Sequence, residues 1–170
     1  MPGVVAFSAR TARPDLHHVR ESLKRGASGT AELELSITIA QLPSSERVFL
    51  RTTFDEARRV AADPASARRP LMGLAISVKD LFDVRGEVTA AGSVVLADAP
   101  PATADCPAVA RMRAAGGAIL GRTNMSEFAF SGVGVNPHHG TPANAADAQV
   151  PRIPGGSSSG EGGTTTHTVK

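Results

Sequence analysis

The sequence has no tryptophan and no tyrosine, a single cysteine, and no long run of apolar residues. Aromatic residues make up only 4% of the chain, so a hydrophobic core must be built mainly from Ala, Val, Leu and Ile. Without about 18 consecutive apolar residues, the sequence offers no membrane span. One cysteine excludes a disulfide within the chain, which is typical of a reducing compartment. We therefore expect a cytoplasmic protein with no membrane contact.

No charge sign dominates the composition either. The formal net charge is +2, and 41% hydrophobic with 20% charged residues is ordinary for one globular domain of 170 residues. The basic residues form no continuous stripe with interleaved aromatics, so nucleic-acid binding is not favoured. The two adjacent histidine pairs, at 17–18 and 138–139, have no carboxylate or cysteine at metal-ligand spacing. We expect no metal and no other cofactor.

The N-terminal part of the chain changes character near residue 30. Residues 1–29 are basic and interrupted by glycine and proline, which predicts a flexible arm, with a transit peptide as the alternative. A capping-box pattern predicts a helix over 30–41 with Thr30 as its N-cap, ended by Pro43. A short strand at 48–50 and a helix over 55–62 are expected next.

Two buried strands separated by a helix are predicted in the middle of the chain. Residues 74–78 form a short apolar run, typical of a strand buried on both faces, and residues 118–121 form a second one. Asp105 is the expected N-cap of a helix over 107–115, which ends at Gly116-Gly117. This order indicates a parallel β-α-β unit and therefore an α/β fold class, with a helix packed against the sheet.

The C-terminal third is predicted to be mostly irregular. A further helix is expected to begin after Asn124 and to bury Met125, Phe128 and Ala129. From Ser131 to Gly163, repeated glycine and proline are typical of loops.

Lys79 is the first residue with chemical potential. It follows an apolar strand, where poor solvation would lower the pKa of its amine and allow it to act as a general base. The alternative is a lysine at a strand end that pairs with Asp80 or Asp83. Position alone does not decide between these roles.

The segment Gly155–Gly163 is the second candidate. Its adjacent glycines allow backbone N–H groups to approach an anion, and three consecutive serines supply hydroxyls. A phosphate-binding P-loop is excluded because Glu161 and Gly162 stand where that motif needs a lysine and a hydroxyl residue. A catalytic loop and a Gly/Ser-rich linker both remain open from this segment alone.

Read together, these segments resemble the amidase signature family in order and spacing, over about residues 30–160. The matching stretches are Gly73–Val84 with Lys79, Ala91–Ser93, Gly121–Phe128, Asn136-Pro137 and Gly155–Gly160. The resemblance implies an α/β fold around a mixed sheet and hydrolysis of carbon–nitrogen amide bonds by a Ser–cisSer–Lys triad.

The resemblance carries residue roles over by position. Lys79 matches the catalytic lysine that relays a proton. Ser157 matches the bridging serine, which follows a cis peptide bond, with Gly156 providing room beside it. Ser131 matches a substrate-contacting hydroxyl, and we expect Gly156 and Ser158 to contribute to substrate binding as well.

One departure from the family concerns the nucleophilic serine. The resemblance places it about two dozen residues after the bridging serine, in a second glycine-rich segment, whereas 13 residues follow Ser157 here. Residues 161–170 are a divergent tail, whose glycines and β-branched residues suit a helix poorly. We therefore expect a partial amidase-signature domain over 30–160, without the C-terminal strands, that is inactive alone.

The family also suggests partners. A small-molecule amide is the expected substrate, and a homodimer is one expected assembly. The alternatives are the glutaminase component of a tRNA-dependent amidotransferase, which acts with a second protein, and a non-catalytic truncated remnant.

Overall fold

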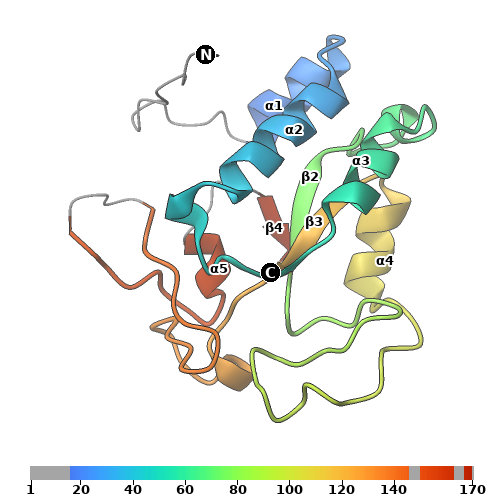
Figure 1. Cartoon of the computed structure of the whole chain (residues 1–170). Coiled ribbons are helices and arrows are strands. Elements are labelled where there is room, and N and C mark those ends of the chain that lie inside the picture. The colour runs from blue at the N-terminus through green and yellow to red at the C-terminus, as the bar shows by residue number, and fades with distance from the viewer. Residues whose placement is uncertain (1–15, 146–149, 163–166, 170) are drawn as a thin grey trace, which may run out of the picture.

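A computed structural model describes residues 16–145, 150–162 and 167–169 (Figure 1). Its longer elements follow in chain order: α1 (Leu16–Lys24), α2 (Gly29–Ala40), β1 (Phe49–Thr52), α3 (Phe54–Ala62), β2 (Ala75–Lys79), α4 (Pro107–Ala114), β3 (Ala118–Thr123), α5 (Ser159–Gly162) and β4 (His167–Val169). Single 3-10 turns occur at Pro43–Ser45, Ser66–Arg68 and Glu127–Ala129. The strands form one mixed sheet in the order β1-β3-β2-β4, in which β1 is antiparallel to β3 and the other pairs are parallel.

Helices cover both faces of the sheet. On one face α2 and α3 pack against the strands through a buried cluster: Leu33, Ile37, Ala57, Ala75, Ala118 and Leu120. On the other face α4 packs through a second cluster: Ile76, Val78, Val84, Val109 and Ile119. Ala75 of β2 belongs to the first cluster and Ile76 and Val78 to the second, as expected for a strand whose neighbouring side chains point to opposite faces. All five residues of β2 and all six of β3 are buried, which confirms the strands predicted from the apolar runs.

The predicted parallel β-α-β unit is confirmed. The pairs Ala75 with Ala118 and Lys79 with Thr123 define the register of β2 and β3, and α4 lies between them in sequence. In Figure 1 a long loop connects the end of β2 to α4. The N-cap of α4 is Cys106 rather than Asp105. The Asp105 carboxylate instead accepts the Arg85 N–H at 2.8 Å and pairs with Arg113 at 3.1 Å.

The prediction of a flexible arm before residue 30 is wrong for residues 16–24, which form α1. Val19 and Leu23 lie one turn apart on that helix and pack against Leu74, so a short apolar stripe fixes an otherwise polar segment. Residues 1–15 lie outside the described residues. The predicted N-cap of α2 is also wrong, because Ser28, not Thr30, accepts the Ala31 N–H at 3.3 Å.

The expected helix after Asn124 is a single 3-10 turn. Met125 is fully buried as predicted, but Phe128 is 51% exposed, and Phe128 and Ala129 have positive φ of 50° and 58°. The Asn124 side-chain oxygen accepts the N–H of the next residue, Met125, at 2.8 Å, and local bonds of this kind compete with a helix.

Two short elements also appear in segments predicted to be irregular. The helix α5 lies within the predicted loop, and β4 pairs with β2 inside the predicted divergent tail. The β-branched residues of that tail suit a strand.

Candidate active site

Lys79 and Ser157 meet although they are 78 positions apart in sequence. The Lys79 amine donates a hydrogen bond to the Ser157 hydroxyl, with 2.6 Å between Nζ and Oγ. Lys79 is the last residue of β2 and only 7% exposed, and Ser157 is half-buried. The carboxyl ends of parallel strands are the usual position for ligand and catalytic groups in α/β folds. The structure thus brings together the two residues predicted to be catalytic.

The loop that carries Ser157 is closely packed around Gly156. The Gly156–Ser157 peptide bond is cis, as the resemblance implied. The Gly156 N–H donates to the Gly132 carbonyl at 2.7 Å. A Cβ at position 156 would lie 2.5 Å from the Ser131 carbonyl oxygen and 2.6 Å from the Gly134 nitrogen, well inside van der Waals contact. Only glycine therefore permits these two loops to approach.

Ser126 contacts both the Ser157 loop and the loop that contains Ser131. Its backbone N–H donates to the Ser157 carbonyl at 2.9 Å, and its hydroxyl donates to the Ser131 carbonyl at 3.1 Å. The side chain is 1% exposed. Sequence reasoning assigned no role to Ser126, because a serine inside a predicted helix gives no signal of these distant bonds.

The predicted substrate-binding residues lie in the same region. The Ser131 hydroxyl accepts the Val133 N–H at 3.2 Å within its own loop. Ser158 is half-buried and follows Ser157 directly. Roles for Ser131, Gly156 and Ser158 in substrate binding stay predictions. Ser159, the third serine, is fully buried.

Asp80, the alternative partner considered for Lys79, contacts Arg122. Asp80 Oδ1 lies 3.3 Å from the Arg122 Nε, and both residues are at least 95% buried. The second oxygen, Oδ2, accepts the Gly92 N–H at 2.9 Å. Asp83, the other alternative, accepts a hydrogen bond from the Thr89 hydroxyl. Arg122 was not among the predicted site residues. The feature of the sequence that could have indicated it is a charged residue near the end of an apolar strand.

A carboxylate links three loops near the site. Glu127 Oε1 accepts the Ser93 hydroxyl at 2.6 Å and lies 2.9 Å from His138 Nε2. The hydrogen bond from Ser93 is the largest influence holding the pKa of Glu127 below its ordinary value; partial burial opposes it, and His138 adds to it. Asn136 also connects these loops, because its side-chain amide donates to the carbonyls of Gly92 and Met125 at 2.8 and 2.7 Å.

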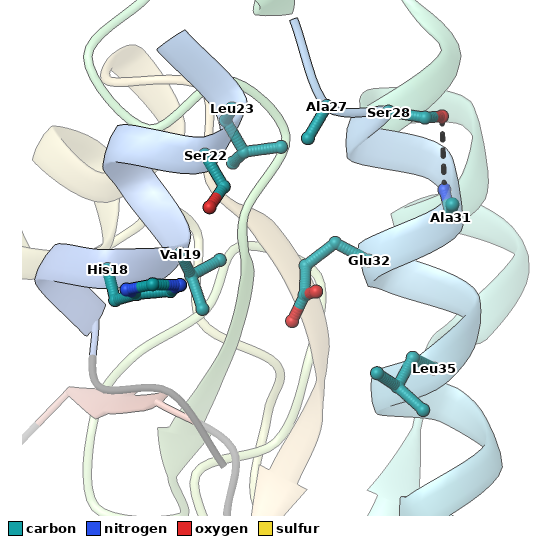
Figure 2. A pocket seen from close by; sticks show the side chains of 9 residues that line it. All are labelled: His18, Val19, Ser22, Leu23, Ala27, Ser28, Ala31, Glu32 and Leu35. Carbon is teal, nitrogen blue, oxygen red and sulfur yellow. Dashed lines mark hydrogen bonds between the residues drawn. The ribbon is translucent and has the colours of Figure 1, made fainter. Parts of the chain in front are cut away.

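A separate groove of about 330 Å³ lies between α1 and α2 (Figure 2). Val19, Leu23 and Leu35 supply apolar walls, and His18 and Glu32 supply polar ones. None of the predicted site residues lines it. Within the described ranges, no group of three or more His, Cys, Asp or Glu side chains could hold a metal ion. No helix in the same residues is both long and apolar enough to cross a bilayer.

A family model for amidases matches residues 35–167. The chain therefore belongs to the amidase signature family, and its α/β fold is that of the family.

Individual relatives agree with this assignment. A 1-carboxybiuret hydrolase component of Pseudomonas sp. (strain ADP) is 44% identical over 63% of this chain and 24% of its own length. A glutamyl-tRNA(Gln) amidotransferase component of Maridesulfovibrio salexigens is 36% identical over 79% of this chain and 28% of its own length. A solved crystal structure of an amidase superimposes with a TM-score of 0.74 at 35% identity, over 86% of this chain and 35% of that one. The chain thus spans about a quarter of the length of these two curated relatives.

Proposed function

We propose that Lys79 and Ser157 are the lysine and the bridging serine of a Ser–cisSer–Lys site that hydrolyses amide bonds. The observation that carries the proposal is the 2.6 Å contact between the lysine amine and the serine hydroxyl. In this role Lys79 accepts and returns a proton, and Ser157 passes it between the lysine and the attacking serine. The attack forms an acyl-enzyme, which water then resolves.

The attacking serine is proposed to come from outside these 170 residues. Ser158 directly follows Ser157, and Ser159 is the first residue of α5. The complete burial of Ser159 keeps its hydroxyl from a substrate. We therefore propose that the chain alone binds an amide through Ser131, Gly156 and Ser158 but does not turn it over. We also propose that the protein is located in the cytoplasm.

The experiment is a chimera. The segment that follows the bridging-serine loop in the Maridesulfovibrio relative would be joined after Gly160, and release of nitroaniline from acyl-nitroanilides would be measured. We expect turnover in the chimera, none in the unextended chain, and a loss of at least about 100-fold on Lys79→Ala or Ser157→Ala. Turnover that survives both substitutions would refute the assigned roles, and Lys79-dependent turnover by the unextended chain would refute the external nucleophile.

A second candidate is a role as one component of an amidotransferase. It is favoured by the 36% identity to the amidotransferase relative over 79% of the chain, and by the fact that both curated relatives are named as parts of larger assemblies. Co-purification with a second protein that binds tRNA would support it. A single species of monomer or homodimer mass at all concentrations would count against it.

A further inference from the structure

The contacts around Lys79 and Ser157 close into a ring. Asp80, next to Lys79, accepts the Ala91 N–H through its carbonyl at 3.0 Å and the Gly92 N–H through its carboxylate at 2.9 Å. Ser93 then donates to Glu127, the neighbour of Ser126, and Ser126 donates to the Ser157 carbonyl. The Lys79–Ser157 hydrogen bond completes the ring.

Two links of this ring, from Ala91 to Asp80 and from Ser126 to Ser157, join backbone groups at both ends, and a change of side chain does not remove them. The bond between Ser93 Oγ and Glu127 Oε1 is the one side-chain to side-chain link on the far side of the ring from Lys79 and Ser157. It is also the shortest link there, at 2.6 Å, and Ser93 is 1% exposed. A bond between the Phe128 N–H and the Ala91 carbonyl runs parallel to it at 2.9 Å.

The turn that follows Glu127 needs support from elsewhere. Phe128 and Ala129 both adopt the left-handed region at φ of 50° and 58°, which costs free energy for residues other than glycine. Apolar packing supplies little of that support, because Phe128 is 51% and Phe130 95% exposed. The Glu127 carboxylate, with Ser93 on one side and His138 on the other, fixes the turn from which Ser126 reaches Ser157.

We propose that Glu127 is a positioning residue that acts through Ser126 to hold Ser157 within hydrogen-bond distance of Lys79. This inference rests on the proposed function, because it assigns Glu127 a role in the same site. Glu127 itself touches neither member of the pair. Its contribution is to keep the loop that carries Ser157 at a fixed position relative to the end of β2.

The test uses the three lysines of the chain, Lys24, Lys79 and Lys170. With ¹³C-labelled lysine, the pKa of Lys79 is followed by NMR while the exposed Lys24 serves as an internal reference. Ser157→Ala sets the scale: loss of the contact between Lys79 Nζ and Ser157 Oγ is expected to change the pKa of Lys79 measurably relative to that of Lys24. We expect Glu127→Ala and Ser93→Ala to reproduce at least half of that change. Glu127→Gln, which keeps an acceptor oxygen, should leave the pKa of Lys79 close to its value in the parent chain.

Each outcome decides the proposal. The double variant Glu127→Ala/Ser93→Ala should change the pKa no more than either single variant, because both remove one bond. Glu34→Ala, which removes an exposed carboxylate paired with Arg58 on α3, should leave the pKa of Lys79 unchanged. If Ser157→Ala changes the pKa of Lys79 but neither the Glu127 variants nor Ser93→Ala does, the positioning role is refuted while the proposed function stands. If Ser157→Ala has no effect either, both are refuted.

Discussion

The strand that carries Lys79 and the loop that carries Ser157 are stabilised in different ways. Every residue of β2 is buried between two hydrophobic clusters, and the strand is hydrogen-bonded to β3 and β4 along both edges. The Ser157 loop contributes no residue to either cluster and is held by backbone and side-chain hydrogen bonds and by a glycine contact. One half of the site therefore depends on apolar burial and the other on polar geometry, so substitutions should affect stability and site geometry separately.

The largest effect on stability is expected in the strand half. Leu120 is fully buried on β3, and Leu120→Ala should lower the free energy of unfolding by about 3 kcal/mol through lost burial and a cavity. Urea unfolding measures this. Leu42→Ala, at a residue 38% exposed outside both clusters, is the control and should change it by less than about 0.5 kcal/mol. Equal losses for the two variants would contradict the assigned core.

A smaller loss of stability but a larger change in the site is expected at Gly156. Gly156→Ala places a methyl group against the Ser131 carbonyl and should cost about 2 kcal/mol. Because the loops must separate, the Lys79–Ser157 contact should be lost, and the NMR signal of Lys79 should move. Gly132→Ala in the same region is the matched control, since a Cβ there has no neighbour within 4 Å. An unchanged Lys79 signal in Gly156→Ala would show that the loop is not held by this contact.

Ser126→Ala should have a moderate effect. It removes the hydrogen bond to the Ser131 carbonyl and leaves the backbone bond to Ser157, so the expected cost is about 1 kcal/mol in urea unfolding. Ser44→Ala, at an exposed serine, provides the baseline. A cost no greater than that of Ser44→Ala would mean that the Ser126 hydroxyl contributes nothing to loop stability.

The smallest effect is a pH dependence at Glu127. Folding lowers the pKa of Glu127, chiefly through the hydrogen bond from Ser93. The ionised carboxylate therefore adds to the stability of the folded protein at pH values above the pKa of Glu127 in the unfolded chain. This contribution is lost as the pH falls through its pKa in the folded protein. Glu127→Gln should therefore lower the urea midpoint at about pH 6 and have less effect at about pH 3.5. A difference between variant and parent that is independent of pH would contradict this ionisation.

The same contrast explains which features the sequence could predict. Apolar runs at 74–78 and 118–121 determine the strands of the β-α-β unit, because burial follows directly from residue type. The ordered motifs pointed to Lys79 and Ser157. The contacts of Ser126 and Glu127 could not be predicted, because each is made with residues distant in the chain. The left-handed conformation of Phe128, where a helix was predicted, likewise could not be read from the local sequence.

The central claim is that Lys79 and Ser157 form one functional pair, and the pKa of Lys79 in the parent chain and in Ser157→Ala tests it most directly. The account predicts that the pKa of Lys79 changes in Ser157→Ala while that of Lys24 stays constant. A pKa of Lys79 that is the same with and without the Ser157 hydroxyl would contradict the account.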